Sequence, residues 1–330
     1  MGKMTSTKEY FELVRSVLAD PVGADPGGDA LAETAQDACV LARQAFELGN
    51  AAARHLAERI LHLIHVGNSF APPLQPVLSV YWSVLMRSKL TASLRKWGGT
   101  PELDPAELRP RLEALVKELG AWNHPLIDII TSSEDMHGLI VYTKNWFGST
   151  HGFTNQLTAL SQRCVGDVKT VVLHNLADEF KGIPHDTLRA RFVERIGLRY
   201  DPQIAVDDQD RVTESFSLLN FRTGISSLQD PFYALGSFYS IEGNFPDECR
   251  RLLVNLRKRG FEEECLEIFK LHVGADEDHA AEWVEILEKA HLTPQVCARV
   301  VDGAVAQLHT RRAMFDAMQE LLASRAPARK

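Results

Sequence analysis

The stretch FKLHVGADEDHAAEW, residues 269–283, decides how this 330-residue chain is interpreted. It contains His272, Asp276 and His279 in an H-x-x-x-D-x-x-H pattern. On a helix that turns by about 100° per residue, the second and third positions lie at roughly 40° and 340° from the first. The three side chains therefore leave one face of a helix over two turns. Two imidazoles and a carboxylate on one stripe form half of a metal site, with ligands suited to iron, manganese or zinc.

The alternative interpretation of this stretch is an acidic, solvated helix face with two incidental histidines. Phe269, Val273 and Trp283 flank the pattern and make the helix apolar enough to be buried. An aspartate buried between two histidines needs a partner, and a metal ion is a good one. Glu277 and Asp278 point away from the stripe, so we expect them in solvent.

The composition narrows the class of protein. Hydrophobic residues make up 45% and charged residues 24% of the chain, as in ordinary globular proteins. The net charge of -8 argues against a nucleic-acid or membrane-surface partner. Five cysteines without a C-x-x-C pair indicate reduced thiols, and the N-terminus lacks the apolar core of a signal peptide. We therefore expect a cytoplasmic protein.

Helical patterns cover nearly the whole sequence, which predicts an all-α fold. Residues 30–66, with an interruption near Gly49, and 74–97 carry apolar stripes at helical spacing. A break follows at GGTPELDP, where Asp104 is a plausible cap before Pro105. Further helices are expected at about 136–148, 150–163, 167–181, 186–197, 210–221, 229–243, 245–259, 261–288 and 294–323.

Two other segments offer ligands that would complete the site. In HNLADEFKGIPH, residues 174–185, Glu179 stands near a helix end, and Gly182 and Pro184 let the chain turn and bring His185 back beside it. The alternative is an ordinary helix end with a surface histidine. In FYALGSFYSIEGNF, residues 232–245, Glu242 is the one acid, so it is either solvated at a helix end or a ligand.

The three segments together are more specific than any one of them. They supply three carboxylates and three imidazoles, enough for two metals with three protein ligands each. The six candidate ligands are Glu179, His185, Glu242, His272, Asp276 and His279.

This arrangement resembles the heme-oxygenase-like diiron oxidases. Their pattern is an N-L-x-acid-Glu helix end with a following histidine, then a glutamate, then H-x-x-x-D-x-x-H. Here NLADE ends in Glu179, and the other ligands follow in the same order, although the gap to His185 is short. WNHPLIDII at 122–130 and VYTKNWFGSTHGF at 141–153 are similar to the first two core helices of that family.

The resemblance implies a seven-helix, heme-oxygenase-like bundle over residues 106–323. Residues 1–105 would form an N-terminal helical extension that makes a homodimer, and residues 324–330 a flexible tail. The cofactors would be two iron ions, with O2 as cosubstrate and an external electron donor as a further partner. The substrate would be a small molecule that carries an amine or a carboxylate.

Members of the resembled family catalyse several reactions, and the sequence favours some of them over others. N-oxygenating members of the family add a carboxylate from the preceding helix, but the sequence from Leu139 to Gly166 contains no Asp or Glu. This favours desaturation or oxidative C–C cleavage over N-oxygenation. A heme oxygenase, a cofactor-independent thiaminase-type bundle and a non-catalytic interaction protein remain as other classes. Arg189, Arg222 and Lys270 are candidate substrate anchors, and the sequence alone does not choose among them.

Overall fold

The computed structural model describes residues 27–67, 76–132, 136–150, 152–200, 210–228 and 230–325. These ranges form helices joined by turns and loops and contain no strand, which confirms the all-α prediction. None of the described helices is long and apolar enough to cross a membrane.

The chain forms two compact units, Met1–Ser93 and Leu94–Lys330. Residues 94–105 of the expected N-terminal extension belong to the second unit. Asp302 fixes this segment there, because its carboxylate accepts hydrogen bonds from the backbone nitrogens of Gly99 (3.0 Å) and Thr100 (2.9 Å). The dimer-forming role of the first unit stays a prediction.

The first unit contains α2 (Gly27–Ala42), a π-helical turn (Arg43–Glu47), α3 (Ala51–Gly67) and most of α4 (Pro76–Trp97). The predicted interruption near Gly49 is present, and Gly49 has a φ of +67°. α3 and α4 are joined by a buried ion pair between Glu58 and Lys89 (2.5 Å). The apolar residues predicted to form the stripe are buried where they are described: Leu56, Ile60, Ile64, Tyr81 and Leu85.

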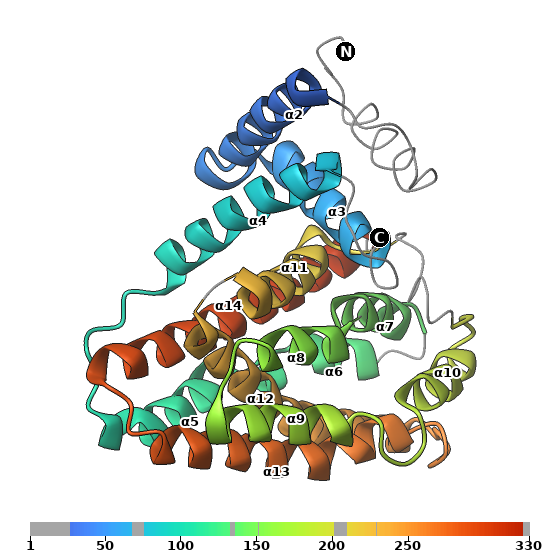
Figure 1. Ribbon diagram of the computed structural model, residues 1–330. Coiled ribbons are helices and arrows are strands. Elements are labelled where there is room, and N and C mark those ends of the chain that lie inside the picture. The colour runs from blue at the N-terminus through green and yellow to red at the C-terminus, as the bar shows by residue number, and fades with distance from the viewer. Residues whose placement is uncertain are drawn as a thin grey trace. The chain divides into compact units, whose positions relative to one another are not determined.

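The second unit begins at the end of α4 and contains the remaining helices (Figure 1). Asp104 caps the 3-10 turn Pro105–Glu107, as predicted, by accepting from the nitrogen of Ala106 at 2.9 Å. After a second 3-10 turn, Ala121–Asn123, most of the helices pack around α12 and α14. The helices are α5 (Leu108–Leu119), α6 (Leu126–Ser132), α7 (His137–Thr150), α8 (Phe153–Ser161), α9 (Gly166–Asp178), α10 (His185–Arg195), α11 (Thr213–Leu228), α12 (Pro231–Lys258), α13 (Glu267–Lys289) and α14 (Pro294–Arg325).

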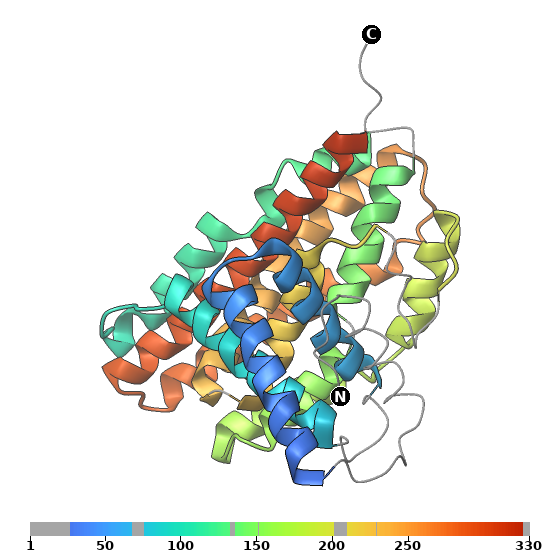
Figure 2. The ribbon, with the colours of Figure 1, turned by 90° about the horizontal axis from the view of Figure 1, so that it is seen from above.

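Two glycines allow α12 and α14 to pack backbone against backbone. A Cβ atom on Gly236 of α12 would lie 1.8 Å from the carbonyl oxygen of Val300, and one on Gly303 of α14 would lie 1.9 Å from that of Tyr233. Any larger residue at either position would push the helices apart. The long red helix α14 can be followed through the second unit in both views (Figure 1 and Figure 2).

The prediction of separate helices at 229–243 and 245–259 is wrong, because α12 runs unbroken through Pro246. A proline inside a helix lacks an N–H and costs about 3 kcal/mol. The packing of α12 along both α13 and α14 outweighs this local cost. The carbonyl that loses its partner is that of Glu242, four residues earlier. The start of the helix predicted at 261 is also corrected, since residues 263–266 form a turn and α13 begins at Glu267.

Candidate metal centre

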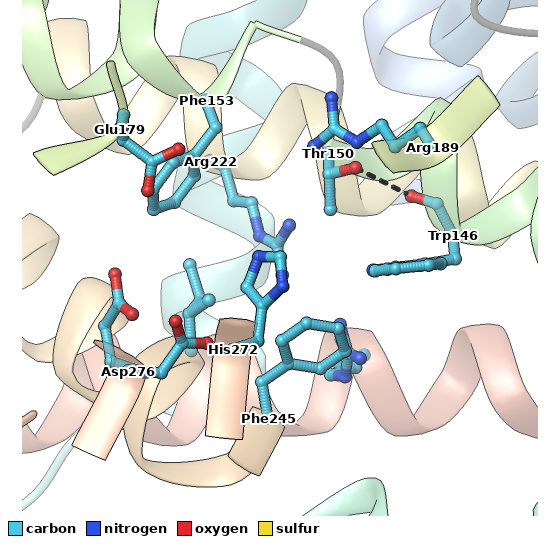
Figure 3. Close-up of a pocket in the computed structure, with 12 residues that line it drawn as sticks. Trp146, Thr150, Phe153, Glu179, Arg189, Arg222, Phe245, His272 and Asp276 are labelled. Carbon is cyan, nitrogen blue, oxygen red and sulfur yellow. Dashed lines mark hydrogen bonds between the residues drawn. The ribbon is translucent and has the colours of Figure 1, made fainter. Parts of the chain in front are cut away.

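A pocket lies among α7 to α14 (Figure 3). In this view Glu179 and Asp276 lie on one side of the pocket, with Phe153 beside Glu179, and Trp146 and Phe245 lie on the other side, with His272 between them. The pocket is lined by Glu179, Glu242, His272 and Asp276, by Arg189, Arg222 and Arg311, and by Trp146, Thr150, Phe153, Ile241 and Phe245.

A compact cluster of three potential metal ligands forms where α12 faces α13. Donor atoms of Glu242, Asp276 and His279 all lie within 4.8 Å of one another, and all three residues are buried. Of the α13 stripe predicted from the 272–279 spacing, Asp276 and His279 belong to this cluster and His272 lines the pocket beside Asp276, while Glu277 and Asp278 are exposed, as expected. Glu242 is 3% exposed, so it is not a solvated helix residue.

His279 is held by a carboxylate that sequence reasoning did not select. Its Nε2 lies 3.3 Å from Oδ2 of Asp178, the last residue of α9. Its Nδ1 is buried without a hydrogen-bond partner and lies 3.6 Å from Oε2 of Glu242. Burial lowers the pKa of His279, but the neighbouring Glu242 and Asp178 outweigh burial and raise it to about 9. An imidazole with one nitrogen bound to a carboxylate and the other pointing at acids is the usual arrangement of a metal ligand.

The second set of ligands, Glu179, His185 and His272, is more open. The α9 helix ends at Asp178, Gly182 turns the chain with a φ of +73°, and α10 begins at His185. Nδ1 of His185 thereby lies 3.8 Å from Oε2 of Glu179, and the rings of His185 and His272 are centred 5.3 Å apart. The predicted turn that returns His185 to Glu179 is therefore present.

Backbone carbonyls fix which nitrogen each of these two histidines can offer. Nδ1 of His272 lies 2.6 Å from the oxygen of Ile268, and Nδ1 of His185 lies 3.2 Å from the oxygen of Glu179. A carbonyl only accepts, so each Nδ1 carries the proton and each Nε2 keeps a lone pair. Burial lowers the pKa of His272 to about 3 and lowers that of His185 as well. Both imidazoles are therefore neutral and ready to bind a cation.

The positive charge around the acids of the pocket is too small to keep the pKa values of Glu179 and Asp276 in their usual range. Burial, and then the charge of Glu242, raises the pKa of Glu179 to about 7. Burial, followed by the charges of Glu242 and Glu179, raises the pKa of Asp276 well above its usual value. Two carboxylates that resist ionisation, those of Glu179 and Asp276, would be stabilised by a bound cation. The carboxylate–imidazole donors and the orphaned His279 nitrogen fit iron.

The comparisons with known proteins identify a family for this chain. The model of a family described as iron-containing redox enzymes matches residues 141–312, just over half of the chain. The chain belongs to this family. The matched range contains all six predicted ligands and Asp178.

Solved structures show the same fold as this member of the family. A domain of unknown function with a heme oxygenase-like fold from Shewanella denitrificans OS217 is 16% identical, with a TM-score of 0.53 over 68% of this chain and 97% of that one. A CADD-like protein of unknown function from Nostoc punctiforme PCC 73102 is 18% identical, with a TM-score of 0.53 over 68% and 99% of the two chains. The predicted heme-oxygenase-like fold is thus confirmed. The comparison with curated proteins gave no match.

Proposed function

We propose that the chain is an O2-dependent diiron oxidase of a small organic molecule. The observation that carries this proposal is the buried triad of Glu242, Asp276 and His279, whose donor atoms lie within 4.8 Å of one another. Its histidine has one nitrogen engaged by Asp178 and the other left without a partner. In a family of iron-containing redox enzymes, such a triad supports an iron site.

The proposed ligands divide into two groups of three. Glu242, Asp276 and His279 would hold one iron, and the more open group of Glu179, His185 and His272 the other. When bound, the irons supply electrons and open positions for O2. The chain's own contribution is to keep His272 and His185 neutral by burial, and to orient the three imidazoles by the Ile268 and Glu179 carbonyls and by Asp178. Trp146, Phe153 and Phe245 give the remaining space an apolar lining.

The lining of the pocket favours desaturation or oxidative C–C cleavage over N-oxygenation. The side formed by α7 and α8 contributes Trp146, Thr150 and Phe153, and no carboxylate occurs from Leu139 to Gly166. Oxidation of the substrate by two electrons supplies half of the electrons that the reduction of O2 to water consumes. We therefore include an external electron donor in the proposal, together with the homodimer.

Cysteine-based catalysis has less support. Burial raises the pKa of Cys164 to about 11 and raises that of Cys249 well above its usual value. A thiol of this kind is protonated at neutral pH and is a weak nucleophile. Neither cysteine lines the pocket.

Oxygen uptake tests the proposed activity. Protein purified without oxygen is supplied with Fe(II), freed of excess metal and mixed with oxygenated buffer in an oxygen electrode. We expect uptake in the wild type, and none above background in the zinc-loaded protein or in Glu242→Gln. Uptake that is absent from the iron-loaded wild type, or equal in Glu242→Gln, would contradict the proposal.

A further inference from the structure

Arg222 is a fully buried cation inside the pocket of the candidate metal centre. It lies on α11, is 1% exposed, and contributes to the pocket lining. Figure 3 shows its guanidinium between the acidic side, with Glu179 and Asp276, and the aromatic side, with Trp146. A buried guanidinium carries a large desolvation cost unless an anion accompanies it.

The hydrogen-bond acceptors of Arg222 are neutral. Its Nη1 donates to the carbonyl oxygen of Ser149 (3.2 Å) and its Nε to the side-chain oxygen of Gln307 (3.3 Å). Within the described ranges, no carboxylate lies at ion-pair distance from it. Burial, and then the charge of Arg311, lowers the pKa of Arg222 to about 9.

Arg311 is a second buried arginine of the same pocket, and unlike Arg222 its guanidinium has a carboxylate as counter-ion. Its Nη2 lies 2.7 Å from Oε2 of Glu248, and both side chains are buried. The other oxygen of Glu248 accepts from the hydroxyl of Tyr142 at 2.6 Å. Arg311 therefore has a dedicated counter-ion, whereas Arg222 does not.

Metal loading weakens the remaining compensation for Arg222. Glu242 and Glu248 act on it from a distance and raise its pKa, but Glu242 is also a proposed metal ligand and Glu248 is paired with Arg311. Two Fe(II) ions carry more positive charge than Glu179, Glu242 and Asp276 carry negative charge. The loaded pocket is thus cationic, with Arg222 beside it, and with Arg189, whose Nη1 lies 3.5 Å from Oδ1 of Asp186, on its wall.

We propose that Arg222 binds a carboxylate group of the substrate, so that the substrate is an organic acid with an apolar part against Trp146 and Phe245. This inference rests on the proposed function. A planar guanidinium matches a carboxylate with two parallel hydrogen bonds. A substrate whose one charged group is an amine would instead meet Arg222, Arg189 and the metals as like charges. Lys270, a third cation considered from the sequence, pairs with Glu263 (2.7 Å) and does not line the pocket.

Calorimetric titration of iron-loaded protein without oxygen tests this assignment. The probes are linear saturated carboxylates of increasing length, each compared with the primary amine and primary amide of the same length. We expect at least one carboxylate to bind about tenfold or more tightly than its amine and amide, because a hydrogen bond to a charged group is worth about 1.5–3 kcal/mol and a tenfold change corresponds to about 1.4 kcal/mol. This comparison uses the wild type alone and does not depend on the folding of a variant.

Variants then assign the effect to Arg222. Arg222→Gln should weaken carboxylate binding by about tenfold or more, and Arg222→Lys, which keeps the charge and loses the planar fork, by less. Both variants should keep the wild-type iron content. The matched control is Arg257→Gln, because Arg257 is 46% exposed and pairs with Glu263 on the surface. It should bind the carboxylate as the wild type does.

The outcomes separate this inference from the function on which it rests. Wild-type protein that takes up no iron would contradict the proposed function and the inference with it. Normal iron uptake with equal binding of carboxylate and amine, with no carboxylate binding, or with undiminished binding in both Arg222 variants would overturn the inference alone.

Discussion

Nε2 of His279 lies 3.3 Å from Oδ2 of Asp178, so the carboxylate at the end of α9 orients the imidazole of α13. Asp178 is itself fixed by Lys181 and lies 3.8 Å from His174. These contacts join two helices at the candidate metal centre. They also explain why the orphaned Nδ1 of His279 points toward Glu242 and not toward solvent.

Asp178→Asn should weaken iron binding without preventing it. Replacing a carboxylate that orients a metal-bound histidine costs about 10–100-fold in metal affinity. The measurement is Fe(II) binding under anaerobic conditions at a series of metal concentrations. The control is Asp247→Asn, because Asp247 is 50% exposed and pairs with Arg250. Equal Fe(II) affinities in the two variants would contradict a role of Asp178 in orienting the metal ligand.

The stability of the metal-free protein should fall as the pH rises from about 6.5 to 9. The pKa of Glu179 is raised to about 7 and that of His279 to about 9, so the folded chain holds protons that the unfolded chain has lost. Stability decreases wherever the folded state binds more protons than the unfolded state. His272, with a folded-state pKa of about 3, opposes this slope only at the low end of the window, near its unfolded pKa of 6.5, where the unfolded imidazole still binds protons.

Thermal unfolding of metal-free protein at several pH values measures this slope. Glu242 contributes to both raised pKa values, so Glu242→Gln should make the melting temperature depend less on pH. Iron should have the same effect, because metal and protons compete for the same ligands. A metal-free wild type whose melting temperature is constant or rises across this window would contradict the assignment of these charges.

The buried group of Tyr142, Glu248 and Arg311 should be important for folding. Glu248→Ala leaves the guanidinium of Arg311 buried without its counter-ion, which costs about 3–5 kcal/mol. The measurement is urea unfolding of the second unit's signal in the full chain. The matched control is Glu288→Ala, since Glu288 also pairs with an arginine, Arg109 at 2.7 Å, but both are about 40% exposed. We expect it to lose less than about 1 kcal/mol, and equal losses would be inconsistent with the burial of Glu248.

Local geometry explains which parts of the site could be predicted from the sequence. The stripe of His272, Asp276 and His279 follows from helical periodicity alone. Gly182 and Pro184 predict the turn that leads to His185. Asp178 carried a signal too, as the acid next to Glu179 in NLADE, but only the packing of α9 against α13 shows that it reaches His279.

Other features depend on packing between distant segments. The break expected before Pro246 is absent because contacts along the whole of α12 outweigh one lost hydrogen bond. Arg222 could not be preferred over Lys270 from the sequence, since their difference lies in which helix faces the pocket. Contacts between helices that are far apart in the sequence cannot be predicted from a local residue pattern.

Glu242→Gln should separate the cost of the buried acid from its role as a ligand. The amide keeps the shape and removes the charge, so the metal-free variant should be as stable as the wild type or more stable by about 1–3 kcal/mol. The same variant should lose iron, because a carboxylate ligand is gone. Urea unfolding of the two metal-free proteins gives the first result and metal analysis the second. A variant that is less stable than the wild type and keeps its iron would show that Glu242 has a structural role only.

The iron content of the anaerobically loaded protein tests the central claim most directly. Protein freed of metal is incubated with excess Fe(II) without oxygen, desalted and analysed for iron per chain. Six ligands predict about two irons in the wild type, and the loss of one or both in His272→Ala and His279→Ala. A wild type that retains no iron, or two variants that retain as much iron as the wild type, would contradict the diiron site.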